Sequence, residues 1–298
     1  MIRGLLRAIG RTAGLVSGAY IAYVAVRGSR LLVRPDVRPF VPDPDGAPAT
    51  PADLGLAYEP VRIVTHDGLT LTGWLVPAAR ETTTAVIVMH GFSGHRLPEL
   101  AAFVPWLAER HHVLQFDFRG HGESDSSVVT LGAHERRDVE AAVAFLASRQ
   151  LGPIALLGVS MGAAIAIVAA SELPVAAVIA DAAFAELHHP IANRMRAVGY
   201  PLPELGARAI VAAAAVRTRS RLADPLRSVA RIAPRALLVI APKNDSLISW
   251  RQSLRLFEAA GEPKELYVAE GAGHAEAYAV DPDRYRQVVL SFLERYLG

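Results

Sequence analysis

A serine stands at the centre of residues 158–162, which read Gly-Val-Ser-Met-Gly. The apolar run before it, residues 154–157, is typical of a buried strand, and the small apolar run after it, residues 163–170, is typical of a buried helix. A strand, a tight turn and a helix would hold the serine hydroxyl at the edge of a sheet, where the glycines permit a strained backbone. Ser160 is therefore predicted to act as a nucleophile.

A serine hydroxyl becomes a useful nucleophile only when other groups assist it. A nearby base must take its proton, an acid must orient that base, and hydrogen-bond donors must stabilise the oxyanion that develops on the substrate. Because the Gly-x-Ser-x-Gly pattern also arises by chance, the prediction for Ser160 depends on finding these partners elsewhere in the chain.

Hydrophobic patterning predicts that the body of the chain alternates strands and helices. Residues 58–65 and 69–76 are β-rich runs joined at Asp67-Gly68, which is typical of a hairpin. The later alternation predicts an α/β fold with a mostly parallel central sheet and helices on both faces. Further strands are expected over residues 85–89, 113–116, 154–157, 175–180, 236–240 and 265–269, and helices over residues 97–110, 131–149, 161–171, 250–260 and 282–297.

Residues 182–222 interrupt this alternation with two helix-like stretches separated by a Gly- and Pro-containing turn. They follow the carboxyl end of a strand, which is where open α/β sheets bind their ligands. We expect a small helical lid at this place, with plain structural decoration as the alternative. Ile191 and Met195 are predicted to bind substrate, because apolar side chains suit an acyl group.

Composition and charge exclude some classes of protein and divide the chain. The 298 residues include no cysteine, which excludes disulfides and thiolate nucleophiles. Residues 1–38 hold seven arginines and one aspartate, whereas the rest of the chain holds 24 basic and 28 acidic residues. The basic character is local, so nucleic acid is not an expected partner. We expect an anchor segment over residues 1–34, a proline-rich linker over residues 35–53 and an enzymatic domain over residues 54–298.

The N-terminal segment contains an uncharged stretch, residues 12–26, with arginines on both sides. As a helix this stretch would span about 22 Å, short of the roughly 30 Å hydrocarbon core, although snorkelling arginines can close such a gap. We favour a membrane anchor or interfacial helix over a cleaved signal peptide and over a helix packed on the body. The protein is therefore expected at a membrane, with its orientation and oligomeric state left open.

Two loops support the prediction for Ser160. Residues 90–94, His-Gly-Phe-Ser-Gly, and residues 117–124, Asp-Phe-Arg-Gly-His-Gly-Glu-Ser, each follow an expected strand. With the serine turn, they resemble the α/β-hydrolase superfamily over residues 57–297, and the N-terminal features resemble its membrane-anchored monoacylglycerol-lipase and serine-aminopeptidase-like group. This resemblance implies an oxyanion hole built from the backbone N–H groups of Phe92 and Met161.

The same resemblance implies the acid and the base. Asp245 lies in the loop after the strand expected at residues 236–240, and His274 ends a Gly-Ala-Gly-His segment after the strand expected at residues 265–269. The order serine, aspartate, histidine is the one that this superfamily uses. Asp181 is the rival acid, because some members of the superfamily place it at the end of the preceding strand.

No cofactor and no metal site are expected from this sequence. The pair His188 and His189 is expected to point in different directions on a helix and to lack a carboxylate at ligand spacing.

The expected reaction is hydrolysis of a small-molecule carboxylic ester through an acyl-enzyme, with short to medium or lipid-derived acyl groups, as in a carboxylesterase or lipase-like serine hydrolase. A serine aminopeptidase that holds the substrate ammonium with Glu276 or Glu204, a thioesterase, and a binding module without activity are the alternatives. A dehalogenase is disfavoured, because its chemistry needs an aspartate where Ser160 stands.

Overall fold

The computed structural model describes the backbone of residues 2–41 and 47–298 and the side chains of residues 17–41 and 47–298. Within these residues, eight strands form one sheet in the order β1-β2-β4-β3-β5-β6-β7-β8. The pairs β1–β2 and β2–β4 are antiparallel and all other pairs are parallel, which confirms the predicted fold class. The strands are β1 (Glu59–Val64), β2 (Thr70–Val76), β3 (Ala85–Met89), β4 (His112–Phe116), β5 (Ile154–Val159), β6 (Ala177–Asp181), β7 (Ala236–Pro242) and β8 (Lys264–Ala269).

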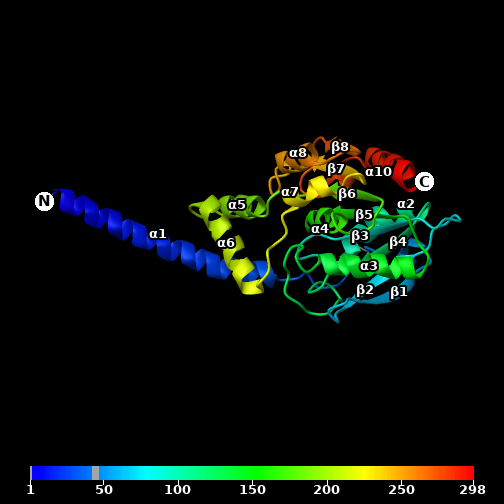
Figure 1. Ribbon diagram of the computed structural model, residues 1–298, viewed down its shortest axis with the longest axis horizontal. Helices are drawn as coiled ribbons and strands as arrows, with labels where there is room; N and C mark the ends of the chain where they lie inside the picture. Colours follow the sequence, from blue (N-terminus) through cyan, green and yellow to red (C-terminus); the bar gives the residue numbers. More distant parts are fainter. Residues whose placement is uncertain (1, 42–46) are drawn as a thin grey trace.

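Helices cover both faces of the sheet (Figure 1). Alternate side chains of each central strand therefore enter two different cores: Val86 of β3 joins the core on one face, and Ile87 joins the core on the other. Every residue of β3 and β5 is buried, as expected for strands covered on both sides. The first face carries α2 (Leu97–Ala108), α9 (Ala277–Val280) and α10 (Pro282–Leu297), and the second carries α3 (Arg136–Ser148), α4 (Met161–Ala170), α7 (Pro225–Ser228) and α8 (Trp250–Ala259).

Helix α3 begins later than the sequence pattern predicts. We expected a helix from residue 131, but the helix starts at Arg136. Leu131 and Gly132 both have positive φ, which is incompatible with a right-handed helix. The buried carboxylate of Glu135 accepts hydrogen bonds from the backbone N–H groups of Thr130 and Gly132, at 2.7 and 2.6 Å. These bonds stabilise a turn at residues 130–135 instead of a first helical turn.

Residues 182–222 contain two helices, α5 (His188–Ala197) and α6 (Pro203–Thr218), which stand beside the sheet (Figure 1). Helix α5 is tied to the loop after β7, because the side-chain amide of Asn193 donates to the carbonyl of Leu247 at 3.0 Å. Helix α5 therefore contacts the loop that follows the carboxyl end of β7.

The N-terminal segment forms one long helix, α1 (Ile2–Val33), whose second half packs against α6. Val24 of α1 is buried among Met195 of α5 and Ala207 and Ile210 of α6. The hydroxyl of Tyr20 donates to the carbonyl of Pro201 at 3.0 Å, which adds a polar contact to this interface. Among the described residues, none of the helices combines the length and hydropathy needed to cross a bilayer.

The residues after α1 run along the main domain. The carbonyl of Val33 accepts from the N–H of Val129 at 2.9 Å, and the N–H of Arg38 donates to the carbonyl of Ser93 at 3.0 Å. Phe40 packs edge-on against His95, with ring centroids 5.3 Å apart. The described part of the predicted linker is therefore attached to the loop that follows β3.

Replacing Gly28 with alanine is expected to weaken the contact between α1 and α6. The added methyl would lie 2.5 Å from Cδ1 and 2.6 Å from Cγ1 of Ile210, so either this side chain or one of the two helices must shift. Gly18 is a matched control on the same helix, because a methyl there meets nothing within 4 Å and adds only helix propensity, about 1 kcal/mol. Hydrogen–deuterium exchange should show faster exchange in the second half of α1 for Gly28→Ala and no acceleration for Gly18→Ala. Equal protection in both variants would contradict the close packing.

Candidate active site

The turn between β5 and α4 holds Ser160 in a strained conformation, with φ 54° and ψ −110°. Only glycine fits at the positions two residues before and two residues after it, Gly158 and Gly162. A Cβ on Gly158 would lie 2.3 Å from the backbone of Gly162, and a Cβ on Gly162 would lie 2.4 Å from the carbonyl oxygen of Met89. The close approach of three backbone segments therefore fixes the turn and directs the serine side chain away from the sheet.

Asp245 lies in the loop after β7, and its side chain is fully buried. One carboxylate oxygen, Oδ1, accepts from the backbone N–H groups of Leu247 and Ile248 at 2.8 and 2.7 Å. The other oxygen, Oδ2, accepts from Nδ1 of His274 at 2.7 Å. The two backbone amides fix the orientation of the carboxylate, so the loop presents Oδ2 to the imidazole.

His274 completes a hydrogen-bonded line to the serine. Its Nε2 lies 3.0 Å from the Oγ of Ser160, while its Nδ1 contacts Asp245. Since Nδ1 donates to a carboxylate, Nε2 is left without a proton and accepts the serine hydroxyl. The structure therefore brings together the three side chains that the sequence analysis selected, in the geometry required of a nucleophile, a base and an orienting acid.

The loop after β3 lies beside Ser160. A Cβ on Gly91 would be 3.7 Å from the Cβ of the serine, and the side chain of Phe92 is 38% exposed. Met161 is the first residue of α4, so its N–H is one of the unpaired amides at a helix N-terminus. Within the described residues, no protein acceptor is hydrogen bonded to the amide of Phe92 or Met161. These are the two amides that the sequence analysis predicts for the oxyanion hole.

His90 fixes the shape of this loop. Its Nε2 accepts from the backbone N–H of Phe118 at 3.0 Å, so Nδ1 carries the proton and donates to the carbonyl of Gly91 at 2.8 Å. Complete burial and the neighbouring ring of His121 hold the pKa of His90 well below its ordinary value. The neutral ring therefore acts as a structural tie between two loops.

Asp181, the rival acid, contacts a different partner. Its Oδ2 accepts from the hydroxyl of Tyr285 on α10 at 3.0 Å, and its Oδ1 has no hydrogen-bond partner in the described part of the chain. Complete burial raises the pKa of Asp181 to about 7, although the hydrogen bond from Tyr285 and the nearby His274 act to lower this pKa. Asp245, and not Asp181, is therefore the carboxylate in contact with the base.

The predicted substrate-binding residues lie on α5. Met195 is buried against Gly206, with its Cε atom near that glycine and its side chain in the core shared with α1. Ile191 is partly buried and packs against both this core and the core beside α4. The contacts of Met195 therefore lie on the side of α5 that faces α6 and α1. Ile191 contacts both the core between α1, α5 and α6 and the core of the main domain.

The sequence analysis missed Arg96, a fully buried arginine at the start of α2. Its guanidinium lies over the rings of Phe40 and Trp74, 4.2 and 3.9 Å from their centroids, and forms an ion pair with Asp117. The partners come from three separate segments, so no local pattern marked this residue. The ion pair fixes the loop after β4 beside the loop that contains Phe92.

The expectation for His188 and His189 is wrong. Both residues stand at the start of α5, and their rings turn toward each other, with centroids 4.2 Å apart. Glu186 supplies a carboxylate 3.5 Å from His189 Nε2, and the possible ligand atoms of the three residues all lie within 4.8 Å. Arg255 already forms an ion pair with this carboxylate at 2.7 Å, which disfavours a cation there.

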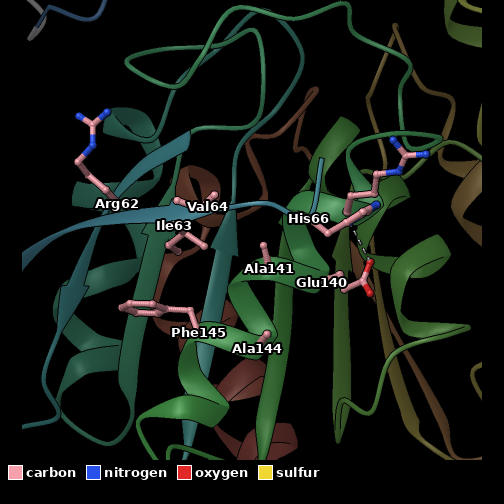
Figure 2. Close-up of a pocket in the computed structure, with 9 residues that line it drawn as sticks. Arg62, Ile63, Val64, His66, Glu140, Ala141, Ala144 and Phe145 are labelled. Carbon is pink, nitrogen blue, oxygen red and sulfur yellow. Dashed lines mark ion pairs between the residues drawn. The ribbon is translucent and has the colours of Figure 1, made fainter. Parts of the chain in front are cut away.

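A groove of about 410 Å³ lies between β1 and α3, away from these residues (Figure 2). Ile63 and Phe145 line it, and His66 and Glu140 form a weak ion pair of 4.0 Å at one end. None of the candidate catalytic residues lines this groove, so it is separate from the site at Ser160.

Comparison with known proteins agrees with this fold. The model of the alpha/beta hydrolase family matches residues 86–288. An uncharacterized protein of Mycobacterium tuberculosis (strain CDC 1551 / Oshkosh) is 30% identical over 289 residues, which cover 95% of this chain and 92% of that protein. The uncharacterized protein YqkD of Bacillus subtilis is 31% identical over 235 residues, or 76% of each chain. The chain therefore belongs to the alpha/beta hydrolase family.

A solved structure adds a functional comparison. The Pyrococcus furiosus esterase Pf2001 is similar to this chain with a TM-score of 0.72 and 28% identity, covering 84% of this chain and 95% of that one. The protein is thus an alpha/beta hydrolase with an esterase among its structural neighbours.

Replacing Gly162 with alanine is expected to distort the serine turn. The added methyl would press on the carbonyl oxygens of Met89 and His90, at 2.4 and 2.8 Å, and these backbone atoms cannot turn aside. We expect a loss of about 1–3 kcal/mol of stability, seen as a lower Tm by circular dichroism. Gly91→Ala is the control, because its methyl would make ordinary contacts of 3.7 and 3.8 Å. An unchanged Tm for Gly162→Ala would show that the turn is not constrained in this way.

Replacing Asp181 with asparagine is expected to stabilise the protein at high pH. The folded-state pKa is raised from 3.8 to about 7, so the unfolded chain loses this proton at a lower pH than the folded chain. Stability from this group therefore falls as pH rises through this range, and the neutral amide removes that loss. The Tm of Asp181→Asn should exceed that of the unmodified chain by roughly 3 °C or more near about pH 8.5, with a smaller difference near about pH 5.5.

The exposed Asp36 supplies the control for this measurement, since Asp36→Asn removes a carboxylate without removing a buried charge. A Tm difference for Asp181→Asn that does not depend on pH would contradict the raised pKa.

Proposed function

We propose that this alpha/beta hydrolase is a serine carboxylesterase that cleaves small esters with short to medium or lipid-derived acyl groups. The observation that carries the proposal is the line from Ser160 Oγ to His274 Nε2, at 3.0 Å, and from His274 Nδ1 to Asp245 Oδ2, at 2.7 Å. The esterase among the structural neighbours supports the same reaction class.

The proposed reaction has two halves. As Ser160 Oγ attacks the ester carbonyl, its proton moves to Nε2 of His274, and Asp245 stabilises the imidazolium that forms. The amides of Phe92 and Met161 hold the oxyanion, and the imidazolium then gives its proton to the departing alkoxide. Water attacks the acyl-enzyme with the same base, releasing the carboxylic acid and restoring the serine hydroxyl.

The charged groups near the site favour an ester over a peptide with a free N-terminus. Glu276 accepts from the backbone N–H of Gly273 at 3.1 Å, and Glu204 forms an ion pair with Arg196. Both carboxylates that were candidates to hold a substrate ammonium are therefore engaged within the protein. The partly exposed ring of Phe92 beside the serine instead offers apolar surface to an acyl chain.

Ser160→Ala is expected to lower kcat for p-nitrophenyl esters by roughly 10⁴-fold or more, since triad members act as a unit. The unmodified chain should hydrolyse esters from acetate to octanoate faster than aminoacyl p-nitroanilides, and a fluorophosphonate probe should label Ser160. The control is Ser148→Ala, an exposed serine at the end of α3. Faster turnover of the anilides would favour an aminopeptidase, and no labelling of the folded chain would favour a binding module.

A further inference from the structure

Charge is divided unequally between two parts of the molecule. We call residues 17–34 and 188–221 the α1–lid unit, which comprises the second half of α1 and the two lid helices. This unit holds nine arginines and one glutamate, a formal charge of +8. Outside this unit and the first 16 residues, the chain holds 19 basic and 28 acidic residues, a formal charge of −9. The net charge of +2 therefore conceals a strong polarity.

The α1–lid unit is held together by a small core of its own. Val24 of α1 packs with Ala192, Met195, Ala207 and Ile210 of the lid, and all five side chains are buried. The two segments are separated by more than 150 residues in the sequence, yet the later part of α1 packs against α6 beside the main domain (Figure 1). Their exposed side chains can therefore act on one partner.

The turn between α5 and α6 carries an unusual exposed apolar tip. Val198, Tyr200, Leu202 and Leu205 are 64%, 48%, 49% and 53% exposed, although they lie within eight successive positions. Tyr20 of α1 hydrogen bonds to this turn, so the tip adjoins the first helix. A soluble surface rarely gathers so many large apolar side chains, and such patches mark contacts with proteins or membranes.

The exposed face of α1 combines the same two kinds of side chain. Tyr23 and Val26 are 58% and 45% exposed, and the arginines Arg27 and Arg30 follow at spacings of three and four residues. Residues at these spacings share one side of a helix. Apolar and cationic side chains thus lie along a single exposed face.

We propose that the α1–lid unit docks on the surface of an anionic phospholipid bilayer. In this arrangement the apolar tip enters the headgroup region while the arginines contact lipid phosphates, which guanidinium groups bind with two parallel hydrogen bonds. Each arginine near an anionic leaflet adds to the attraction, and the acidic remainder of the molecule is turned away from the lipid.

The charge also discriminates between possible occupants of this surface. A second copy docked through the same surface would bring two surfaces of like charge together, which is unfavourable. A neutral bilayer would accept the apolar tip but would leave the arginines without partners. An anionic bilayer satisfies both features, and this inference is independent of the chemistry at Ser160.

Vesicle flotation tests the proposal with the full-length chain carrying Ser160→Ala, so that no lipid is hydrolysed. We expect binding to vesicles of phosphatidylcholine with phosphatidylglycerol, weaker binding to pure phosphatidylcholine, and loss of binding as NaCl is raised from about 0.1 to about 0.5 M. The pair Arg27→Gln and Arg30→Gln should weaken binding to anionic vesicles by roughly tenfold or more. The pair Tyr200→Ser and Leu205→Ser should weaken binding to both kinds of vesicle.

Matched controls come from exposed residues outside the α1–lid unit. Arg62→Gln with Arg251→Gln removes two arginines of the main domain, and Val64→Ser with Val280→Ser removes two exposed apolar side chains. Both control pairs should bind within about twofold of the parent chain.

Three outcomes would overturn the proposal. Binding that ignores lipid charge excludes an anionic surface as the partner. Full binding by both α1–lid variants assigns attachment to residues 1–16. If Tyr200→Ser with Leu205→Ser changes the oligomeric state in size-exclusion chromatography but leaves vesicle binding unaltered, the apolar tip contacts a second copy of the chain instead of a bilayer.

Discussion

The close approach of three backbone segments at the serine turn is the constraint on which the candidate site depends. Gly162 lies so near the carbonyl of Met89 that no side chain fits between them, and Gly158 lies as near to Gly162. This contact joins β3, β5 and α4 at one point and holds Ser160 at a positive φ. The hydroxyl therefore leaves the sheet in one direction only, which is the direction in which the loops after β7 and β8 place His274.

The two buried aspartates near the base show how backbone surroundings separate otherwise similar carboxyl groups. Asp245 receives two backbone amides and the imidazole, so its negative charge is solvated by fixed dipoles. Asp181 receives only the hydroxyl of Tyr285, and burial raises its pKa to about 7. The carboxylate of Asp245 is therefore fully hydrogen bonded beside the base, while that of Asp181 is neutral over much of the acidic range. The sequence analysis assigned Asp245 as the acid and kept Asp181 as the rival, because some members of the superfamily place the acid at the end of the preceding strand.

Features that depend on local pattern were predictable, and features that depend on distant partners were not. The strands, the serine turn and the loop containing Phe92 each have a local signature, and the structure contains them. The late start of α3 required knowledge that Glu135 would fold back onto residues 130–132, which competes with helix formation. Local hydropathy marked α1 as apolar, but it could not show that Gly28 would pack against Ile210, more than 180 residues away.

The α1–lid unit is connected to the candidate site by two loops rather than by one. Asn193 of α5 holds the carbonyl of Leu247, a residue whose own N–H is bonded to Asp245. At the other end, the chain leaving α1 is bonded through Arg38 to Ser93, next to Phe92. A shift of α1 and the lid would therefore reach the acid loop and the oxyanion loop together. Both contacts are made to backbone carbonyls of the loops, those of Leu247 and Ser93. The surface proposed to meet the bilayer is therefore connected directly to the loops that position the candidate catalytic residues.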